Sequence, residues 1–264
     1  MITSMKNAYN VAGKNVLITG GTQGLGKGMV DAFLECGARV GFTGRNTEKA
    51  QQVIEEMSQK YPGCFIKYYQ ADQRKQEDCQ NAVDGFVADF GKIDTLVNNA
   101  GAGRGRDAFG FIDNNFEDWH YTLGLDLTAV FMMSCMCAKL MKDTGGGSII
   151  NITSNAGLVV NKPQNMVSYS TAKAGANHMT RMLAWEWAPY KIRVNAIAPG
   201  YFKSGITPPE AAHLEKLWID EYTPTKRRGD PAEIGALAIY LAAEASEQMT
   251  GEILCIDGGY SLAN

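Results

Sequence analysis

The sequence predicts a single α/β domain of the doubly wound type, with helices on both faces of a parallel sheet. Short apolar runs alternate with helical patterns along the 264 residues, which is typical of right-handed βαβ units. A glycine-rich turn follows the first apolar run. No repeat, low-complexity tract or linker divides the chain, and one α/β domain commonly reaches this size. We therefore expect residues 1–264 to form one domain.

The expected elements can be placed in chain order from their apolar periodicity and turn signals. We expect strands at residues 16–19, 39–43, 64–70, 93–97, 148–152, 192–197 and 253–256. We expect helices at residues 27–36, 47–60, 76–90, 119–141, 168–188 and 231–242. Two glycine-rich or polar stretches, 101–115 and 201–222, are expected to be long loops, the second being a substrate loop. Both follow strand ends, where open α/β sheets bind ligands.

Composition excludes several classes of function. With 25 Lys and Arg against 28 Asp and Glu the net charge is −3, so the chain offers no broad basic field for nucleic acid or a membrane surface. The six cysteines have no CxxC spacing and the three histidines are scattered, so we expect no metal. We expect no secretory signal and no membrane-spanning run of about 18 apolar residues. We expect a cytoplasmic protein with reduced thiols.

A glycine-rich loop between the first strand and the first helix is the first candidate binding site. Gly20, Gly24 and Gly26 would let the backbone turn tightly and approach a pyrophosphate at the helix N-terminus. The spacing is GxxxGxG and therefore differs from the GxGxxG fingerprint. The alternative is a glycine-rich turn without a ligand. The context of strand, turn and helix favours a dinucleotide.

The end of the second strand indicates which dinucleotide is bound. An acidic residue there would bind a ribose 2′-hydroxyl, whereas an arginine accommodates a 2′-phosphate. This chain has Arg45 and no carboxylate in residues 42–46. We therefore favour NADP(H) over NAD(H). The alternative is that Arg45 is a solvated loop residue.

Three residues form a candidate acid–base group. Tyr169 and Lys173 lie four residues apart, which places them on one helix face. A nearby ammonium favours the phenolate of a tyrosine, whose ordinary pKa is near 10. Ser154 ends a strand, where its hydroxyl could hydrogen-bond a substrate oxygen. The group fits proton transfer coupled to hydride transfer at a carbinol or carbonyl carbon. Each residue taken alone has a structural alternative: a helix surface pair, or a helix cap.

These motifs together resemble the short-chain dehydrogenase/reductase family over almost the whole chain. The residues that carry the resemblance are 19–26, Asp72, Asn-Asn-Ala-Gly at 98–101, Ser154, Tyr169 with Lys173, 193–195, Pro199-Gly200 and 257–259. Within the family the nearest branch contains mannitol dehydrogenases, sorbose reductases and gluconate 5-dehydrogenases. The resemblance implies one dinucleotide-binding and catalytic domain, and a homotetramer with the Tyr169 helix and the C-terminal strand at its interfaces.

The resemblance also implies roles for individual residues. Tyr169 would be the general acid/base, Lys173 would lower its pKa and hold the nicotinamide ribose, and Ser154 would orient the substrate oxygen. Asp72 would contact adenine, Asn98 would support the sheet, and the Ile197 backbone with Ser204 would hold the carboxamide. The residues expected to bind the cofactor are Gly20, Thr22, Gln23, Gly24, Leu25, Gly26, Arg45, Asp72, Gln73, Asn98, Ala100, Gly101, Tyr169, Lys173, Pro199, Gly200 and Ser204.

One position departs from the family pattern. The helix before the serine strand usually carries an asparagine that helps to hold a water in the proton relay. Here that residue is Asp126, within Leu-Asp-Leu-Thr. An ionised carboxylate accepts hydrogen bonds and donates none. Asp126 therefore joins the candidate catalytic residues with a role that the pattern leaves open.

The substrate class is the least determined part of the prediction. The polar residues near the presumed pocket are Asn155, Asn161, Gln164 and Asn165, and of these Asn155 and Gln164 are expected to contact substrate. They would suit a polyol, a ketose or a keto-sugar acid. Met166, Phe202 and Trp218 could equally line an apolar pocket for a hydroxysteroid or 3-oxoacyl substrate. A non-catalytic nucleotide-binding protein on the same fold also remains open, as does another Rossmann-type enzyme such as a methyltransferase, although the latter leaves Tyr169 and Lys173 unexplained.

Overall fold

A parallel sheet forms the centre of the molecule. The computed structural model describes residues 4–101, 116–160, 166–203, 216 and 219–262. Its seven strands lie in the order β3-β2-β1-β4-β5-β6-β7, and every pairing is parallel. The strands are β1 (Asn15–Ile18), β2 (Arg39–Gly44), β3 (Ile66–Gln70), β4 (Thr95–Asn98), β5 (Gly147–Ile152), β6 (Ile192–Pro199) and β7 (Ile253–Ile256). The predicted fold class, a Rossmann-type α/β fold, is confirmed.

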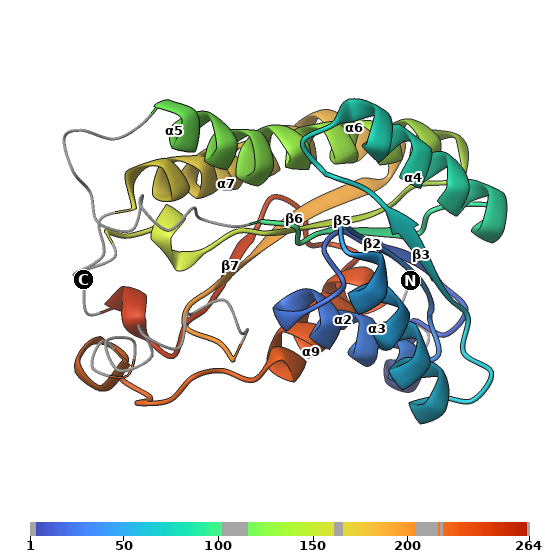
Figure 1. The fold of residues 1–264 in the computed structure, drawn as a ribbon, viewed down its shortest axis with the longest axis horizontal. Helices are drawn as coiled ribbons and strands as arrows, with labels where there is room; N and C mark the ends of the chain where they lie inside the picture. The colour runs from blue at the N-terminus through green and yellow to red at the C-terminus, as the bar shows by residue number, and fades with distance from the viewer. Residues whose placement is uncertain (1–3, 102–115, 161–165, 204–215, 217–218, 263–264) are drawn as a thin grey trace.

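Helices cover both faces of this sheet (Figure 1). One face carries α2 (Gly24–Glu35), α3 (Thr47–Lys60) and α9 (Pro231–Ala242), and the other carries α4 (Gln76–Phe90), α5 (Phe116–Leu123), α6 (Ala129–Asp143) and α7 (Val167–Trp187). A π-helical turn, η1 (Gly124–Thr128), joins α5 to α6. Short elements complete the chain: α1 (Met5–Ala8) and the 3₁₀ turns η2 (Asn155–Gly157), η3 (Ala188–Tyr190), η5 (Glu244–Ser246) and η6 (Tyr260–Leu262).

The strands feed two hydrophobic cores, one on each face. Val16 and Ile18 of β1 pack with α2, α3 and α9, whereas Leu17 between them packs with α4 and α6. In β5, Ile150 and Ile149 divide between the same two cores. Alternate side chains of a strand point to opposite faces. A sheet covered on both sides therefore needs continuous apolar strands, which explains the short apolar runs in the sequence.

The predicted elements agree closely with the structure where sharp turn signals bound them. The helices predicted at 47–60, 76–90 and 231–242 and the strand predicted at 253–256 have those bounds in the structure. Asp230 begins α9 with a capping box that includes Glu233, and Pro231 occupies the first helical turn. The helix predicted at 119–141 is longer, and a π turn interrupts it at Gly124–Thr128.

Residues 116–143 form the one described helix that is long and apolar enough to cross a membrane by length and composition, with a best window of mean hydropathy 1.5. This segment packs on the sheet, where Met133, Cys137 and Met141 join the core under α4 and α7. It also carries the fully buried carboxylate of Asp126. Contact with the sheet accounts for the apolar side chains of this helix.

Candidate active site

The glycine loop lies at the carboxyl end of β1, where the strand order reverses between β1 and β4. Gly20 and Gly24 have φ angles of +71° and +56°, which side chains disfavour. A Cβ on Gly26 would lie 2.1 Å from the carbonyl oxygen of Gly20. The loop thus folds back on the first turn of α2 so closely that only glycine fits. The close approach matches the backbone cradle that a pyrophosphate needs.

The first turn of α2 presents unsatisfied N–H groups at this loop. The N-cap residue, Gln23, makes no capping hydrogen bond, and the first turn has no acidic residue. Such a helix start attracts anions because its N–H groups and its dipole both favour negative charge. The structure therefore fits a dinucleotide phosphate at the loop that the sequence indicated.

Thr19 and Asn99 hold the loop to the end of β4. The Thr19 hydroxyl accepts hydrogen bonds from the backbone N–H groups of Asn99 and Ala100, at 3.0 and 2.9 Å. The Asn99 amide donates to the carbonyl oxygens of Thr19 and Gly20, at 2.9 and 3.1 Å. Neither side chain was among the predicted site residues. The signal that could have indicated Asn99 was the second asparagine of the Asn-Asn-Ala-Gly motif.

Asn98 supports the sheet, as the resemblance implied. Its amide donates to the Ser134 hydroxyl and to the Asn151 side chain, each at 2.9 Å. The Asn151 amide in turn donates to Thr180 of α7 at 2.9 Å. This buried polar chain links β4, β5, α6 and α7. It positions the helix that carries Tyr169.

A pocket at the ends of β2 and β3 contains Arg45 and Asp72. The Asp72 carboxylate accepts two hydrogen bonds from the Arg74 guanidinium, at 3.0 and 2.5 Å. The hydrogen bond from Arg74 is the main cause that lowers the pKa of Asp72. Arg45 is exposed, and no ion pair engages it among the residues that the structure describes. This pocket suits the adenosine end of a dinucleotide.

Other residues that the resemblance implies at the cofactor lie at or after the carboxyl ends of β3 and β6. The Gln73 side chain is buried and donates to Thr43 at 3.0 Å, so it links β2 to the start of α4. Gly200 follows β6, and its N–H donates to Ile256 at 3.0 Å. The Ile197 carbonyl oxygen accepts from the N–H and the hydroxyl of Thr153. Ser204 lies outside the described residues.

Lys173 lies buried at the centre of the candidate acid–base group. Its ammonium is 3.0 Å from the Asp126 carboxylate, and only 4% and 0% of these two side chains is exposed. The same ammonium donates to the carbonyl oxygen of Ile152 at 3.0 Å. A Cβ on Gly101 would lie 2.5 Å from the Asp126 carboxylate oxygen and 3.3 Å from the Lys173 ammonium. The pair therefore lies directly against the end of the β4 loop.

Tyr169 lies one helical turn before Lys173, whose ammonium is 5.5 Å from the centre of the phenol ring. Burial raises the pKa of Tyr169, the Lys173 charge and a hydrogen bond with Ser154 lower it, and the Asp126 charge raises it. The Ser154 hydroxyl also accepts from the N–H of Ala156 at 3.1 Å, so it caps the η2 turn. The same Ser154 hydroxyl therefore caps the η2 turn and hydrogen-bonds Tyr169, so the two interpretations of Ser154 do not exclude each other.

Asn155 is the predicted substrate residue that the structure describes. It is 2% exposed, and its carbonyl oxygen accepts from the Ser154 hydroxyl at 3.4 Å. Its amide nitrogen has no hydrogen-bond partner among the described residues. An unsatisfied buried donor is costly. The other predicted substrate residue, Gln164, lies outside the described residues, as do Asn161, Asn165 and Trp218.

Comparison with known proteins agrees with this geometry. A family model described as enoyl-(acyl carrier protein) reductase matches residues 20–261. An NADP-dependent mannitol dehydrogenase of Hypocrea jecorina is 35% identical over 96% of this chain and 94% of its own length. A 2-dehydro-3-deoxy-D-gluconate 5-dehydrogenase of Dickeya dadantii is 36% identical over 96% of this chain and 98% of its own. The crystal structure of an NADPH-dependent 3-quinuclidinone reductase from Rhodotorula rubra superposes with a TM-score of 0.91 at 32% identity, covering 99% of this chain and 96% of the other.

The chain belongs to the short-chain dehydrogenase/reductase family. It is therefore an oxidoreductase of alcohol and carbonyl groups that works with a nicotinamide nucleotide. As a member of this family it departs from the usual pattern at Asp126, and the structure shows where that carboxylate lies. It contacts the family's lysine, which is Lys173 here.

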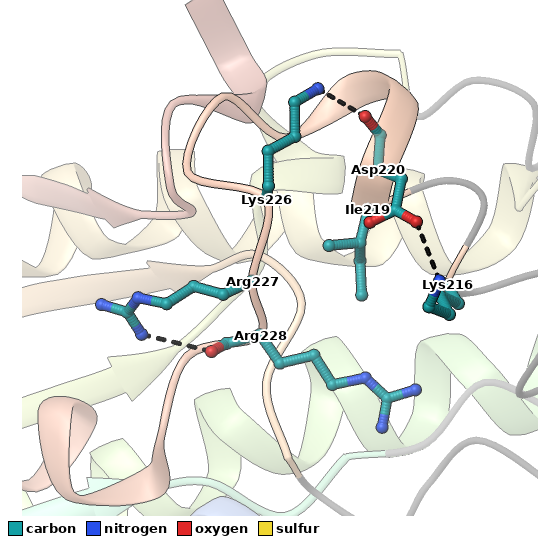
Figure 2. A pocket seen from close by; sticks show the side chains of 6 residues that line it. All are labelled: Lys216, Ile219, Asp220, Lys226, Arg227 and Arg228. Carbon is teal, nitrogen blue, oxygen red and sulfur yellow. Dashed lines mark hydrogen bonds and ion pairs between the residues drawn. The ribbon is translucent and has the colours of Figure 1, made fainter.

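A basic segment of this short-chain dehydrogenase/reductase, Lys226-Arg-Arg228, borders a second pocket beside Lys216, Ile219 and Asp220 (Figure 2). Arg227 pairs with Glu233 of α9 at 2.7 and 3.0 Å. Lys226 donates to the backbone of Asp220, whose carboxylate pairs with Lys216. These contacts attach the segment around 219–222 to α9. The basic run therefore belongs to the loop that precedes Pro231.

Proposed function

We propose that this enzyme is an NADP(H)-dependent oxidoreductase that interconverts the carbonyl and secondary alcohol of a polyol, a ketose or a keto-sugar acid. The observation that carries this proposal is the placement of Tyr169 and Ser154 around the buried ammonium of Lys173, beside the glycine loop. Asp126, the partner of Lys173, lies close to Gly101, which follows β4 in the segment that Asn99 holds to the glycine loop.

The chemistry divides between cofactor and protein. The bound nicotinamide supplies or accepts the hydride. In reduction Tyr169 donates its phenolic proton to the substrate oxygen, and in oxidation the phenolate takes that proton back. Ser154 donates a hydrogen bond to the same oxygen, where negative charge develops. Lys173 stabilises the phenolate that reduction leaves behind, because opposite charges favour the ionised form.

Tyr169→Phe should abolish turnover while the nucleotide still binds. The substitution removes the transferable proton and keeps the ring, so kcat should fall by about 10²- to 10⁴-fold. The measurement is steady-state oxidation of NADPH, together with the Kd for NADPH by fluorescence titration. As a control, Tyr69→Phe removes a hydroxyl that bonds Asp89 away from the site, and it should retain turnover. A rate close to that of the wild type in Tyr169→Phe would exclude the acid/base role.

Arg45 supports the choice of NADP(H). It lies at the end of β2 in a pocket with Gln70, Asp72 and Lys75. Two carboxylates also line this pocket: Arg74 holds Asp72, and Asp78 accepts a hydrogen bond from the N–H of Asp72. Two basic side chains therefore face this pocket where a 2′-phosphate needs positive charge. Relatives with NADP-dependent and NADPH-dependent activity agree with this proposal.

Arg45→Ala should weaken NADPH binding by about 10- to 100-fold, because a charged hydrogen bond contributes about 1.5–3 kcal/mol. The Kd for NADH should change by no more than about twofold. Titration of both nucleotides against both proteins gives the comparison. Lys92→Ala, which removes a cation before β4 at the amino ends of the strands, is the matched control. Equal losses for NADPH and NADH would contradict 2′-phosphate recognition by Arg45.

Asn155 supports a hydroxylated substrate. Its amide nitrogen is a buried donor without a partner among the described residues. The residue follows Ser154 directly, so this donor lies next to the hydroxyl that would hold the reacting oxygen. A neighbouring substrate hydroxyl would satisfy it. The mannitol and 2-dehydro-3-deoxy-D-gluconate dehydrogenases among the relatives act on substrates of this class.

A substrate screen of the wild-type protein and of Asn155→Ala tests whether Asn155 recognises a hydroxylated substrate. Fructose, sorbose and 5-ketogluconate should be reduced with higher kcat/KM than a ketosteroid or an acetoacetyl thioester. Asn155→Ala should lower kcat/KM by about 5- to 10-fold for the hydroxylated substrates, since one hydrogen bond contributes about 1 kcal/mol. All substrates would contact Ser154. The thioester is therefore the internal control, because a disturbed Ser154 would lower its kcat/KM as well. An equal loss for every substrate would remove Asn155 from substrate recognition.

We also propose a homotetramer. Exposed apolar side chains mark two separate surfaces. The first lies on α6 and α7, with Phe131, Met182 and Trp185, which are 47%, 46% and 83% exposed. The second lies beside the edge strand β7, where Leu262 is 90% exposed. Exposed apolar surfaces and open sheet edges mark interfaces. Two distinct two-fold interfaces generate a tetramer of D₂ symmetry.

Trp185→Glu combined with Phe131→Glu should convert the tetramer into dimers, because each partner would bury a charge at the same patch. Light scattering coupled to size-exclusion chromatography measures the mass. Tyr9→Glu, at an exposed aromatic residue outside both surfaces, should leave the mass unchanged. A wild-type protein that elutes as a monomer would overturn the proposal, as would a tetramer that survives the double substitution.

The cytoplasm remains the proposed compartment. All six cysteines are free thiols in the structure. Free thiols are usual in a reducing compartment.

A further inference from the structure

We propose that Asp126 is the resident counter-ion of Lys173 and that, through this pair, it makes Tyr169 hold its proton to a higher pH than a neutral residue at position 126 would. Asp126 is then a positioning residue that favours the protonated, reductive form of the enzyme at neutral pH. This inference rests on the proposed acid/base role of Tyr169.

The π turn brings the Asp126 carboxylate to the lysine. Gly124–Thr128 inserts one wide turn between α5 and α6, and Asp126 at its centre is fully buried. π turns inside helices are rare and occur frequently at functional sites. One oxygen of Asp126 lies 3.0 Å from the Lys173 ammonium. A Cβ at Gly101 would lie 2.5 Å from the same oxygen, so the loop after β4 also packs close to it.

Lys173 has few donors to share. An ammonium carries three N–H groups. One points to Asp126 and one to the Ile152 carbonyl oxygen, each at 3.0 Å. The third remains for a cofactor ribose hydroxyl or for the phenol side. The pair is thus built into the fold on two elements, η1 and α7, with β5 as a third support.

The charge balance around Tyr169 follows from this geometry. With a neutral residue at position 126 the phenolate would face a net charge of +1 from Lys173. With Asp126 present, its negative charge partly cancels the positive charge of Lys173, so the phenolate is stabilised less. Burial is the largest cause that raises the pKa of Tyr169, and Asp126 adds to it while Lys173 opposes it. Burial lowers the pKa of Lys173, but Asp126 and Tyr169 together raise it above its ordinary value, so this lysine stays charged.

The other titratable groups on the elements around this pair do not shift the pKa of Tyr169 or Lys173. The π turn packs against α5, α6 and α7. The charged and titratable side chains on those described helices are Glu117, Asp118, His120 and Tyr121 on α5, Cys135, Cys137, Lys139, Lys142 and Asp143 on α6, and His178, Arg181 and Glu186 on α7. None of them contributes to the shifted pKa of Tyr169 or Lys173. Among the described residues, Asp126 is therefore the charge that acts on both Tyr169 and Lys173.

The charge of Asp126 should shift the pH dependence of catalysis in one direction. Alcohol oxidation needs the phenolate, so its kcat/KM rises with pH through the pKa of Tyr169. Removal of the Asp126 charge lowers that pKa and moves the rising limb to lower pH. A nearby charge shifts a pKa by about one unit or more. Carbonyl reduction needs the phenol, so its falling limb should move in the same direction.

The experiment is a pH profile of kcat/KM for alcohol oxidation by Asp126→Asn, at saturating NADP⁺. The rising limb should move to lower pH by about one unit. Asp143→Asn is the matched control, since it makes the same change on an exposed residue at the end of α6. Its limb should coincide with that of the wild type. An Asp126→Asn limb that stays in place or moves to higher pH would overturn the proposal.

A second variant covers the case in which Asp126→Asn folds poorly. Asp126→Glu keeps the charge, so its rising limb should remain at the wild-type position even if kcat falls. A limb that moves in Asp126→Glu as far as in Asp126→Asn would show that geometry, and not charge, sets the profile, and would also overturn the proposal. Ultraviolet difference titration against Tyr169→Phe reads the phenol directly without turnover. Retained activity in Tyr169→Phe would instead refute the proposed function, so the two failures are distinguishable.

Discussion

The reversal of strand order between β1 and β4 is the constraint on which the rest of the site depends. The chain leaves these neighbouring strands toward opposite faces, which opens a crevice at their carboxyl ends. Thr19 and Asn99 bridge that crevice at its base with four hydrogen bonds. The bridge holds the glycine loop on one side and the Asn-Asn-Ala-Gly loop on the other. Because Gly101 in turn abuts Asp126, the position of the acid–base group follows from the same bridge.

A second consequence concerns how a charged lysine is kept inside the protein. Burial of an ammonium is unfavourable unless charges and hydrogen bonds compensate it. Lys173 has both, in Asp126 and the Ile152 carbonyl oxygen. The buried chain from Asn98 through Asn151 to Thr180 fixes α7 against β5, which keeps Lys173 within reach of those partners. Polar side chains therefore do the positioning here, inside an otherwise apolar interior.

The sequence was sufficient wherever local chemistry decides the structure. Pro231 marked the start of α9, and short continuous apolar runs marked the strands. The spacing of Tyr169 and Lys173 predicted a shared helix face, and the structure places them there. Contacts between distant segments could not be predicted in this way. The partners of Asp126, Asn99 and Gln73 depend on a π turn and on how three loops meet, and no local pattern encodes those meetings.

The site divides into two ends with different electrostatics. The glycine loop and the first turn of α2 offer N–H donors with no acidic residue in that turn, and Arg45 stands without an ion pair among the described residues. That end is unbalanced toward positive charge, which suits a phosphorylated ligand. At the chemical end the charge of Lys173 is balanced by Asp126 before any ligand arrives. Changes at the first end should therefore act on nucleotide affinity, whereas changes at the second should act on the pH dependence of proton transfer. The two properties are separable because the anion-binding donors and the proton donor belong to different elements of the fold.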